Sequence, residues 1–225
     1  MRKALIALCF CMTSLNVSAA NESFVYTELW IGQSNLDVRV KPSTLSIGIT
    51  SVNNLSGSLT YDDPTYYGIE VGASKFAGSP LRVGVFFQTA EIDLKKASGS
   101  GTASDGTTTV DLAVNASGAQ LRGVGLDFDN HVRLFGVNSY YDFNQGSKFR
   151  PFVGVGLGQA DIQNARSGRF FGGMNLGFNY DISKNAYLGV RLSNYWIDGP
   201  TDELGLNYGT IKVNNYGLHW GYRRY

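Results

Sequence analysis

The chain has 225 residues, a formal net charge of +1, 28 glycines, 13 tyrosines, 13 phenylalanines and 5 prolines. A charge so close to zero does not favour a nucleic acid partner. No stretch after residue 20 approaches the roughly 20 apolar residues that a membrane-spanning helix needs. Two classes remain, a soluble all-β domain and a closed β-barrel that satisfies its backbone hydrogen bonds inside a membrane.

Residues 1–20, MRKALIALCFCMTSLNVSAA, have the parts of a secretory signal peptide. Arg2 and Lys3 form the charged start, an apolar run follows, and small residues ending at Ala19 or Ala20 form the cleavage site. The apolar run is too short to span a membrane. We therefore predict a cleaved signal peptide over residues 1–20 and one exported domain over residues 21–225.

Both cysteines, Cys9 and Cys11, lie inside the predicted signal peptide. The exported domain is therefore expected to fold without disulfides. Its two histidines, His131 and His219, do not belong to a Cys/His cluster of the kind that binds zinc. We expect neither a metal nor a cofactor.

The exported part contains eight segments in which apolar residues alternate with polar residues or glycine. In residues 169–181, for example, Phe170 and Leu176 share one face, while Gly173 and Asn175 share the other. An alternation of period two indicates a strand. The eight segments are residues 24–34, 66–74, 81–91, 129–143, 148–160, 169–181, 186–197 and 210–225.

In each segment the bulky apolar side chains oppose glycine and polar side chains. A barrel with lipid outside and a crowded, hydrated interior needs this arrangement. The alternative is a soluble lipocalin-like carrier, which requires the apolar face inside. An eight-stranded bore has no room for so many large side chains in addition to its own polar set.

The links between the segments alternate in length, being short at 75–80, 144–147 and 182–185 and longer at 35–65, 92–128, 161–168 and 198–209. Outer-membrane barrels have short periplasmic turns and longer outer loops. An even number of strands leaves both ends of the chain on the periplasmic side. We predict an all-β fold, an eight-stranded antiparallel up-and-down transmembrane β-barrel with short periplasmic turns and long extracellular loops.

The last segment, Thr210 to Tyr225, carries a polar-x-Gly-x-x-hydrophobic-x-aromatic pattern over Asn215 to Tyr222. This pattern resembles the C-terminal assembly signal of bacterial outer-membrane β-barrel proteins, in which the insertion machinery reads the last strand. We expect this strand to pair with residues 24–34, and its aromatics to face lipid near the periplasmic end. The residues assigned to the signal are Asn215, Gly217, Trp220, Tyr222 and Tyr225.

Two internal pieces widen the resemblance, SYYDF at residues 139–143 and FRPFVGVGLG at residues 149–158. They are similar to the centre of small outer-membrane barrels of the OmpA, OmpX and opacity-protein type. The resemblance extends from about residue 24 to the end of the chain. It implies an outer-membrane location and a barrel assembled with the help of periplasmic chaperones and the barrel assembly machinery.

The predicted inward faces carry charged residues that must be paired or hydrated. We expect a polar plug in which the two glutamates meet Arg82, Arg150 and Arg191. The alternative is an ion path gated by the same pairs, but the narrow bore of an eight-stranded barrel favours the plug. Inward glycines are expected to make room for large neighbours. The interior polar network consists of Glu28, Glu70, Arg82, Arg150, Arg191 and Arg223.

The long loops at 35–65 and 92–128 contain further alternation, for example at Leu112 and Val114. We expect them to protrude above the membrane as a hairpin sheet, within which the Gly/Ser/Thr/Ala run from Ala97 to Thr109 is mobile. An exposed sheet edge can recruit an extended partner segment. A neighbouring loop can instead cover the edge.

His131 is the rim residue whose chemistry could serve catalysis. Some small outer-membrane barrels act on lipid A or on peptides with a histidine and a carboxylate near the outer rim. Asp127 and Asp129 flank His131 in sequence, but neighbours in a strand alternate between faces. We therefore expect a solvated loop histidine here, and a hydrogen-bonded interior histidine at His219.

These patterns predict an outer-membrane barrel with a structural or surface-interaction role, in adhesion or envelope integrity, and without catalytic residues. The alternatives are a narrow porin-like channel and, less favoured, a rim enzyme that acts on lipid A or peptides. The expected partners are outer-membrane lipid and lipopolysaccharide, the assembly machinery and chaperones during biogenesis, and a host or surface ligand for loops 35–65 and 92–128.

Overall fold

The computed structural model describes residues 23–47, 50–74, 80–123, 130–143, 147–163, 165, 167–202 and 205–225. The predicted signal peptide lies outside these residues, and so do Asp127 and Asp129. Within the described ranges, no helix has the length and apolarity to cross a membrane.

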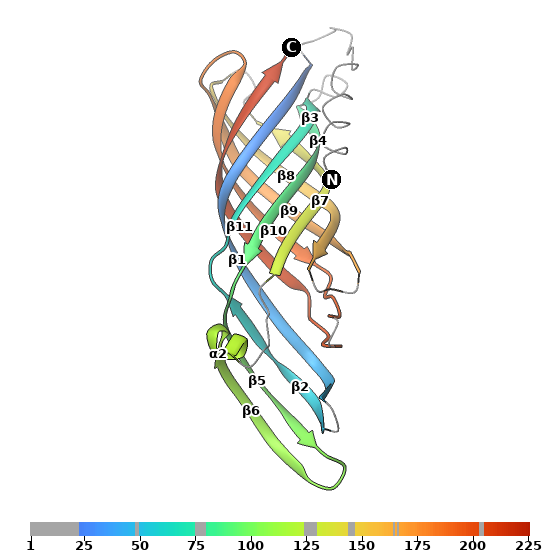
Figure 1. Ribbon diagram of the computed structural model, residues 1–225. Coiled ribbons are helices and arrows are strands. Elements are labelled where there is room, and N and C mark those ends of the chain that lie inside the picture. Colours follow the sequence, from blue (N-terminus) through green and yellow to red (C-terminus); the bar gives the residue numbers. More distant parts are fainter. Residues whose placement is uncertain are drawn as a thin grey trace, which may run out of the picture.

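Eight antiparallel strands form a closed barrel (Figure 1). Each predicted segment becomes one of them, because its alternation gives the strand one face for lipid and one for the interior. The strands are β1 (Phe24–Ile47), β3 (Thr65–Ser74), β4 (Leu81–Ile92), β7 (Asn130–Asp142), β8 (Phe149–Ile162), β9 (Arg169–Asp181), β10 (Ala186–Ile197) and β11 (Ile211–Arg224).

The barrel closes between its first and last strands. β11 pairs with β1 in continuous register from Val25 opposite Arg224 to Asp37 opposite Lys212. The predicted pairing of the last segment with residues 24–34 is thus confirmed. This pairing leaves no open sheet edge within the barrel, which a span through lipid requires.

The two faces of the barrel have the predicted polarity. Large apolar side chains point outward, with Phe170 68% exposed and Leu157 65% exposed. Charged side chains point inward, and Glu28 and Glu70 are both completely buried. An apolar exterior around a polar interior suits a barrel with lipid outside.

A four-stranded sheet projects beyond the barrel at the end opposite the C-terminus (Figure 1). It consists of the last part of β1, β2 (Thr50–Tyr61), β5 (Leu94–Ser104) and β6 (Thr109–Ser117), in that order. A short helix, α2 (Gly118–Gly123), follows β6. The predicted protrusion is therefore present, and we call it the extension sheet.

The prediction that residues 97–109 form a mobile run was wrong for most of that run. Residues 97–104 belong to β5, which pairs with β2 on one side and with β6 on the other. The small side chains allow this close pairing, and Gly57 lies directly opposite Gly99. Backbone hydrogen bonds to two neighbours thus order a composition that is typical of flexible segments.

The link before β11 packs against the first strand of the extension sheet. The backbone N–H of Gly209 donates to Arg39 at 2.7 Å, and that of Lys41 donates to Asn207 at 2.8 Å. The Tyr208 hydroxyl donates to Asp202 at 2.7 Å. Burial and this contact with a carboxylate raise the pKa of Tyr208 above its ordinary value. This link therefore lines the β1 side of the extension sheet near its base.

Candidate functional site

Glu28 of β1 lies at the centre of the barrel interior. Its carboxylate accepts hydrogen bonds from Arg82 of β4, from Arg191 of β10 and from the Tyr187 hydroxyl, the last at 2.6 Å. A buried carboxylate is tolerable only when donors satisfy its oxygens. Glu28 meets this condition through two strands that are far from β1 in the sequence.

Glu70 of β3 forms a second, equally buried carboxylate. Tyr26 donates to its Oε1 at 2.6 Å, while Asn138 and Tyr140 donate to its Oε2 at 2.7 Å and 2.8 Å. Arg191 Nη1 lies 3.7 Å from the same Oε2 and so links the two carboxylates. A third buried carboxylate, that of Asp142, lies 3.3 Å from Arg82 Nε.

Aromatic rings cover the faces of the buried guanidinium groups. The guanidinium carbon of Arg82 lies 4.9 Å from the ring centroid of Tyr26 and 4.4 Å from that of Tyr140. The same atom of Arg191 lies 4.4 Å from the Trp30 ring. Carboxylates thus bind the edges of the guanidinium groups and aromatic rings bind their faces, which reduces the cost of burying them.

A second ionic cluster lies at the short-turn end of the barrel. Asp181, at the end of β9, accepts hydrogen bonds from Arg150 at 2.9 Å and from Arg223. The expectation that Arg150 would meet Glu28 or Glu70 was wrong. Arg150 is the second residue of β8, directly beside the end of β9, so Asp181 is the carboxylate within its reach.

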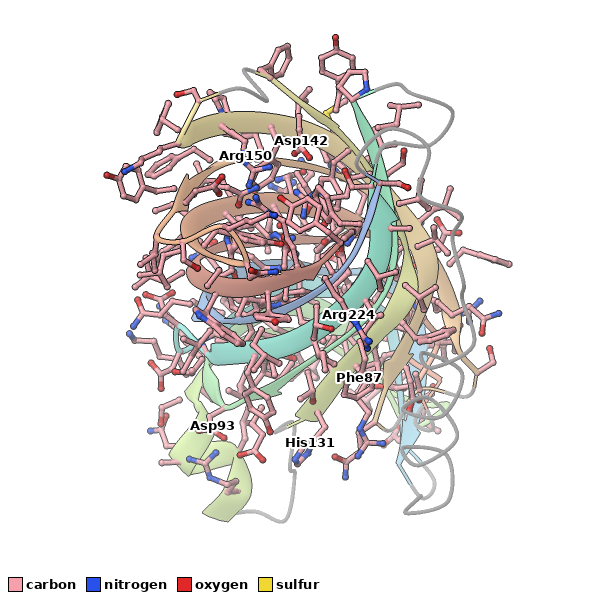
Figure 2. The ribbon with its side chains drawn as sticks, turned by 90° about the horizontal axis from the view of Figure 1, so that it is seen from above. Phe87, Asp93, His131, Asp142, Arg150 and Arg224 are labelled. Atoms are coloured by element: carbon pink, nitrogen blue, oxygen red, sulfur yellow. The ribbon has the colours of Figure 1, made fainter. Side chains whose placement is uncertain are left out.

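Glycines opposite the large inward side chains make this dense filling possible. Gly221 lies opposite Tyr187, and Gly173 lies opposite Tyr195. A Cβ atom at either glycine would overlap the facing ring. Figure 2 shows side chains filling the space inside the ring of strands, with Arg150 among them.

The sequence alone did not identify the tyrosine donors of this network. Tyr26 and Tyr140 donate to Glu70, and Tyr187 donates to Glu28. The signal that could have found them was the same alternation, because Tyr187 lies two residues before the inward Gly189 and Tyr26 lies two before Glu28. A tyrosine on an inward face is a hydrogen-bond donor available to a buried carboxylate.

The five residues assigned to the assembly signal lie on or next to β11. Asn215 and Gly217 point inward, and Asn215 accepts a hydrogen bond from Ser34 of β1. Trp220 and Tyr222 point outward and are 43% and 46% exposed. The ring of Tyr225 packs edge-on against Phe24 at 5.4 Å between centroids. Tyr225 therefore contacts the beginning of β1, where the barrel closes.

The two histidines occupy different surroundings. His131, at the outer rim, contacts Glu91 through Nε2 at 3.1 Å and Gln163 through Nδ1 at 2.9 Å, and it is exposed. Its carboxylate neighbour thus comes from the adjacent strand β4, since directly opposite residues share a face. His219 is buried and contacts Asn179. In the described part of the chain, no group of three or more His, Cys, Asp or Glu side chains is arranged to hold a metal ion.

The extension sheet differs in character from the barrel interior. Its β5–β6 turn is held by Asp105, whose carboxylate accepts from the backbone N–H of Thr107 at 2.9 Å and of Thr108 at 2.7 Å. These hydrogen bonds to the charged form lower the pKa of Asp105 to about 2. β6 is the last strand of the sheet order and, among the described strands, pairs with β5 alone. Its outer backbone edge is therefore available to an additional strand.

Comparisons with known proteins agree with this architecture. One family model matches residues 5–223, that of the outer membrane protein beta-barrel domain. No curated protein sequence matches the chain.

Among solved structures, Neisserial surface protein A is 12% identical with a TM-score of 0.52, over 90% of this chain and 99% of that one. The outer membrane protease OmpT of Escherichia coli is 6% identical with a TM-score of 0.45, over 92% and 99%. The attachment invasion locus protein Ail of Yersinia pestis, solved with the heparin analogue sucrose octasulfate, is 10% identical with a TM-score of 0.41, over 90% and 99%. At these identities a likeness concerns the fold alone.

Proposed function

The chain belongs to the family of outer membrane β-barrel domains, and from this premise we propose that it is a surface-interaction protein of the bacterial outer membrane. In this proposal the barrel is an anchor, and the extension sheet is the part that binds molecules outside the cell. One observation carries the proposal: the interior is occupied by its own side chains, while the projecting sheet ends in β6, which among the described strands pairs with β5 alone.

The filled interior supports an anchor rather than a channel. An ion that passed Glu28 would have to displace Arg82 or Arg191 from its carboxylate. Removing one partner from a buried ion pair costs about 3–5 kcal/mol. We expect the purified barrel in a planar bilayer to give no steady conductance. Steady conductance from correctly folded protein would instead support the porin-like alternative.

The chemistry of the extension sheet supports binding through its backbone. Residues 97–117, which cover most of β5, the turn and all of β6, carry two charged side chains, Asp105 in the turn and Asp111 in β6. A surface of this kind offers few charge-specific contacts, whereas an unpaired strand edge offers a row of donors and acceptors to any extended segment. The partner class that fits best is therefore an extended polypeptide.

This proposal assigns no catalytic role to His131 at the outer rim. Both nitrogens of His131 are engaged by Glu91 and Gln163 at an exposed position. We expect His131→Ala to leave surface binding unchanged, and the purified protein to leave lipid A and peptides intact. Hydrolysis that His131→Ala abolished would support the enzyme alternative.

The C-terminal strand fits the proposed route to the membrane. Its outward aromatics, Trp220 and Tyr222, would contact lipid near the periplasmic surface. We propose that chaperones and the barrel assembly machinery act on this strand, and that the finished barrel is surrounded by phospholipid and lipopolysaccharide.

A shortened variant tests the function of the extension sheet. Val38 lies opposite Leu59 and Ala97 lies opposite Ala116, so each hairpin can be cut at these pairs and closed with an Asn-Gly turn without a change of register. Intact cells that display the native or the shortened protein are used to select peptides from a random library.

We expect the native protein to enrich peptides rich in strand-forming residues, and the shortened barrel to lose at least about 90% of this binding because the edge is gone. A heat-dependent shift in gel mobility checks that the shortened barrel is folded. Equal peptide binding by the two proteins would contradict the proposal.

A further inference from the structure

The hydrogen-bond pattern of the β5–β6 turn indicates which residues of β6 face the unpaired edge. The backbone N–H of Asp105 donates to the carbonyl of Thr108, so the carbonyl of Thr108 points toward β5. Along an antiparallel strand, residues whose backbone groups point toward the partner alternate with residues whose groups point away. The residues whose N–H and C=O groups then point away from β5 are Thr109, Asp111, Ala113, Asn115 and Ser117.

This edge is complementary to itself. When two copies of β6 meet in antiparallel fashion with Ala113 on a twofold axis, the full strands Thr109–Ser117 overlap from end to end. Ala113 then exchanges both backbone bonds with Ala113 of the second copy. Asp111 lies opposite Asn115 of the second copy, so the carboxylate meets an amide donor and no like charges face each other.

The side chains of β6 favour the same register. Val110, Leu112 and Val114 share one face and are 54%, 36% and 38% exposed. A twofold axis normal to the sheet keeps this face on the same side in both copies. Leu112 would lie beside Val114 of the second copy, and these pairs would form one apolar stripe across the joint.

The direction of β6 determines where the second copy must be. β6 runs along the extension sheet from its outer tip back toward the barrel, roughly along the long axis of the barrel (Figure 1). Antiparallel pairing reverses this direction, so the second barrel points the opposite way. Two copies of the barrel in one membrane have the same orientation, so the second copy must belong to a facing membrane.

We propose that β6 is a homotypic adhesion strand, which joins the extension sheets of two copies from facing outer membranes into one continuous sheet. This inference rests on the proposed function, to which it adds the identity of one partner. The nine residues of β6 span roughly 30 Å at about 3.3 Å per residue, and they lie in the extension sheet, beyond the barrel strands (Figure 1).

A joint made by one strand edge is small and therefore weak. Stable protein interfaces bury about 1,200–2,000 Å² in total, which a single strand pair does not approach. Two facing membranes present many copies, and multivalency strengthens weak contacts by a factor of about 100–10,000. The joint is thus expected between membranes, while the protein in detergent remains monomeric.

Vesicles that carry variants with altered charges on β6 test the proposal. Phosphatidylcholine vesicles with two different dyes are loaded with the native protein or with one of two variants. In the acidic variant, Asn115→Asp places a second carboxylate opposite Asp111 of the other copy, so two carboxylates face each other at both such pairs in the joint. In the basic variant, Asp111→Lys with Asn115→Lys does the same with two ammonium groups. Fluorescence microscopy counts the vesicles that are joined.

Native vesicles are expected to join each other and not to join protein-free vesicles. Each variant is expected to join its own kind at least about tenfold less, because like charges meet. Acidic and basic vesicles mixed together are expected to join again, and this recovery also demonstrates that both variants are folded.

Undiminished joining within each variant population overturns the proposal, and so does failure of the mixture to recover. Joining of native vesicles to protein-free ones would assign the contact to lipid and overturn it as well. If vesicles fail to join while peptide selection still depends on the extension sheet, the second copy is excluded and the surface-interaction function stands. If the peptide binding is independent of the sheet, the function itself fails.

Discussion

The barrel interior and the extension sheet are stabilised in different ways. In the interior, Glu28 and Glu70 connect strands that are distant in sequence through charged hydrogen bonds. In the extension sheet, small residues such as Gly57 and Gly99 face each other, and the strands are joined by backbone pairing. The barrel is therefore expected to lose stability when one interior side chain is changed, whereas the sheet is expected to tolerate such changes and lose only its function.

The largest expected effect comes from removing the end of the closing strand. A chain truncated after Gly217 loses the pairing of Leu218 and the residues after it with β1 and β10, which reopens the barrel edge. We expect no insertion into the outer membrane, as measured by membrane fractionation and by gel mobility with and without heating. The shortened extension variant is the matched control and should insert normally. Normal insertion of the truncated chain would show that the last strand is dispensable.

The next effect in size concerns the buried charges. Glu28→Gln keeps the shape of the side chain but leaves Arg82 and Arg191 with one carboxylate fewer, so we expect a loss of about 3–5 kcal/mol in the free energy of unfolding. Urea unfolding in lipid vesicles, followed by tryptophan fluorescence, measures the change. Glu91→Gln at the exposed rim should cost less than about 0.5 kcal/mol. Equal losses in the two variants would remove the distinction between interior and surface.

A smaller effect comes from two adjacent glycines of β9. Gly173 faces the Tyr195 ring, while a Cβ at Gly172 would meet nothing within 4 Å. Gly173→Ala should lower the free energy of unfolding by about 1–3 kcal/mol through overpacking, and Gly172→Ala should leave it within about 0.5 kcal/mol. The same unfolding assay measures both. A neutral Gly173→Ala would mean that the interior is less densely filled than the contacts indicate.

The smallest effect is confined to the turn of the extension sheet. The pKa of Asp105 is lowered to about 2. The ionised carboxylate therefore stabilises the turn fully above the ordinary aspartate pKa, and this stabilisation is lost as the pH falls through about 2. Asp105→Ala should speed amide hydrogen exchange at Thr107 and Thr108 several-fold and leave the barrel strands unchanged. Faster exchange throughout the barrel would show that the two regions are coupled.

The arrangement of the barrel followed from local patterns. Alternation in residues 169–181 predicted both the strand and its outward face, because side-chain direction in a strand reverses at each residue. The pairing of residues 24–34 with the last segment followed from the closure of the barrel, in which the first and last strands meet. The same alternation also placed the six charged residues on inward faces.

The partners of the charged residues could not be obtained in that way. Arg150 binds Asp181 rather than a glutamate, and His131 contacts Glu91 rather than its sequence neighbours. Both depend on the stagger between strands, which sets the height of each residue along the barrel. No local pattern contains that stagger.

The alternation and the lengths of the links were therefore enough to predict the eight barrel strands, the polarity of their faces and the closure of the barrel, since these depend on a period of two along each strand and on the order of the strands. Which charges meet, and whether residues 97–104 are ordered, depends instead on contacts in the folded protein. Those residues have the composition of a flexible linker, and they become a strand because β2 and β6 lie on either side of them. The physical reason is the same in both cases: such contacts are made between segments that the chain brings together only when it folds.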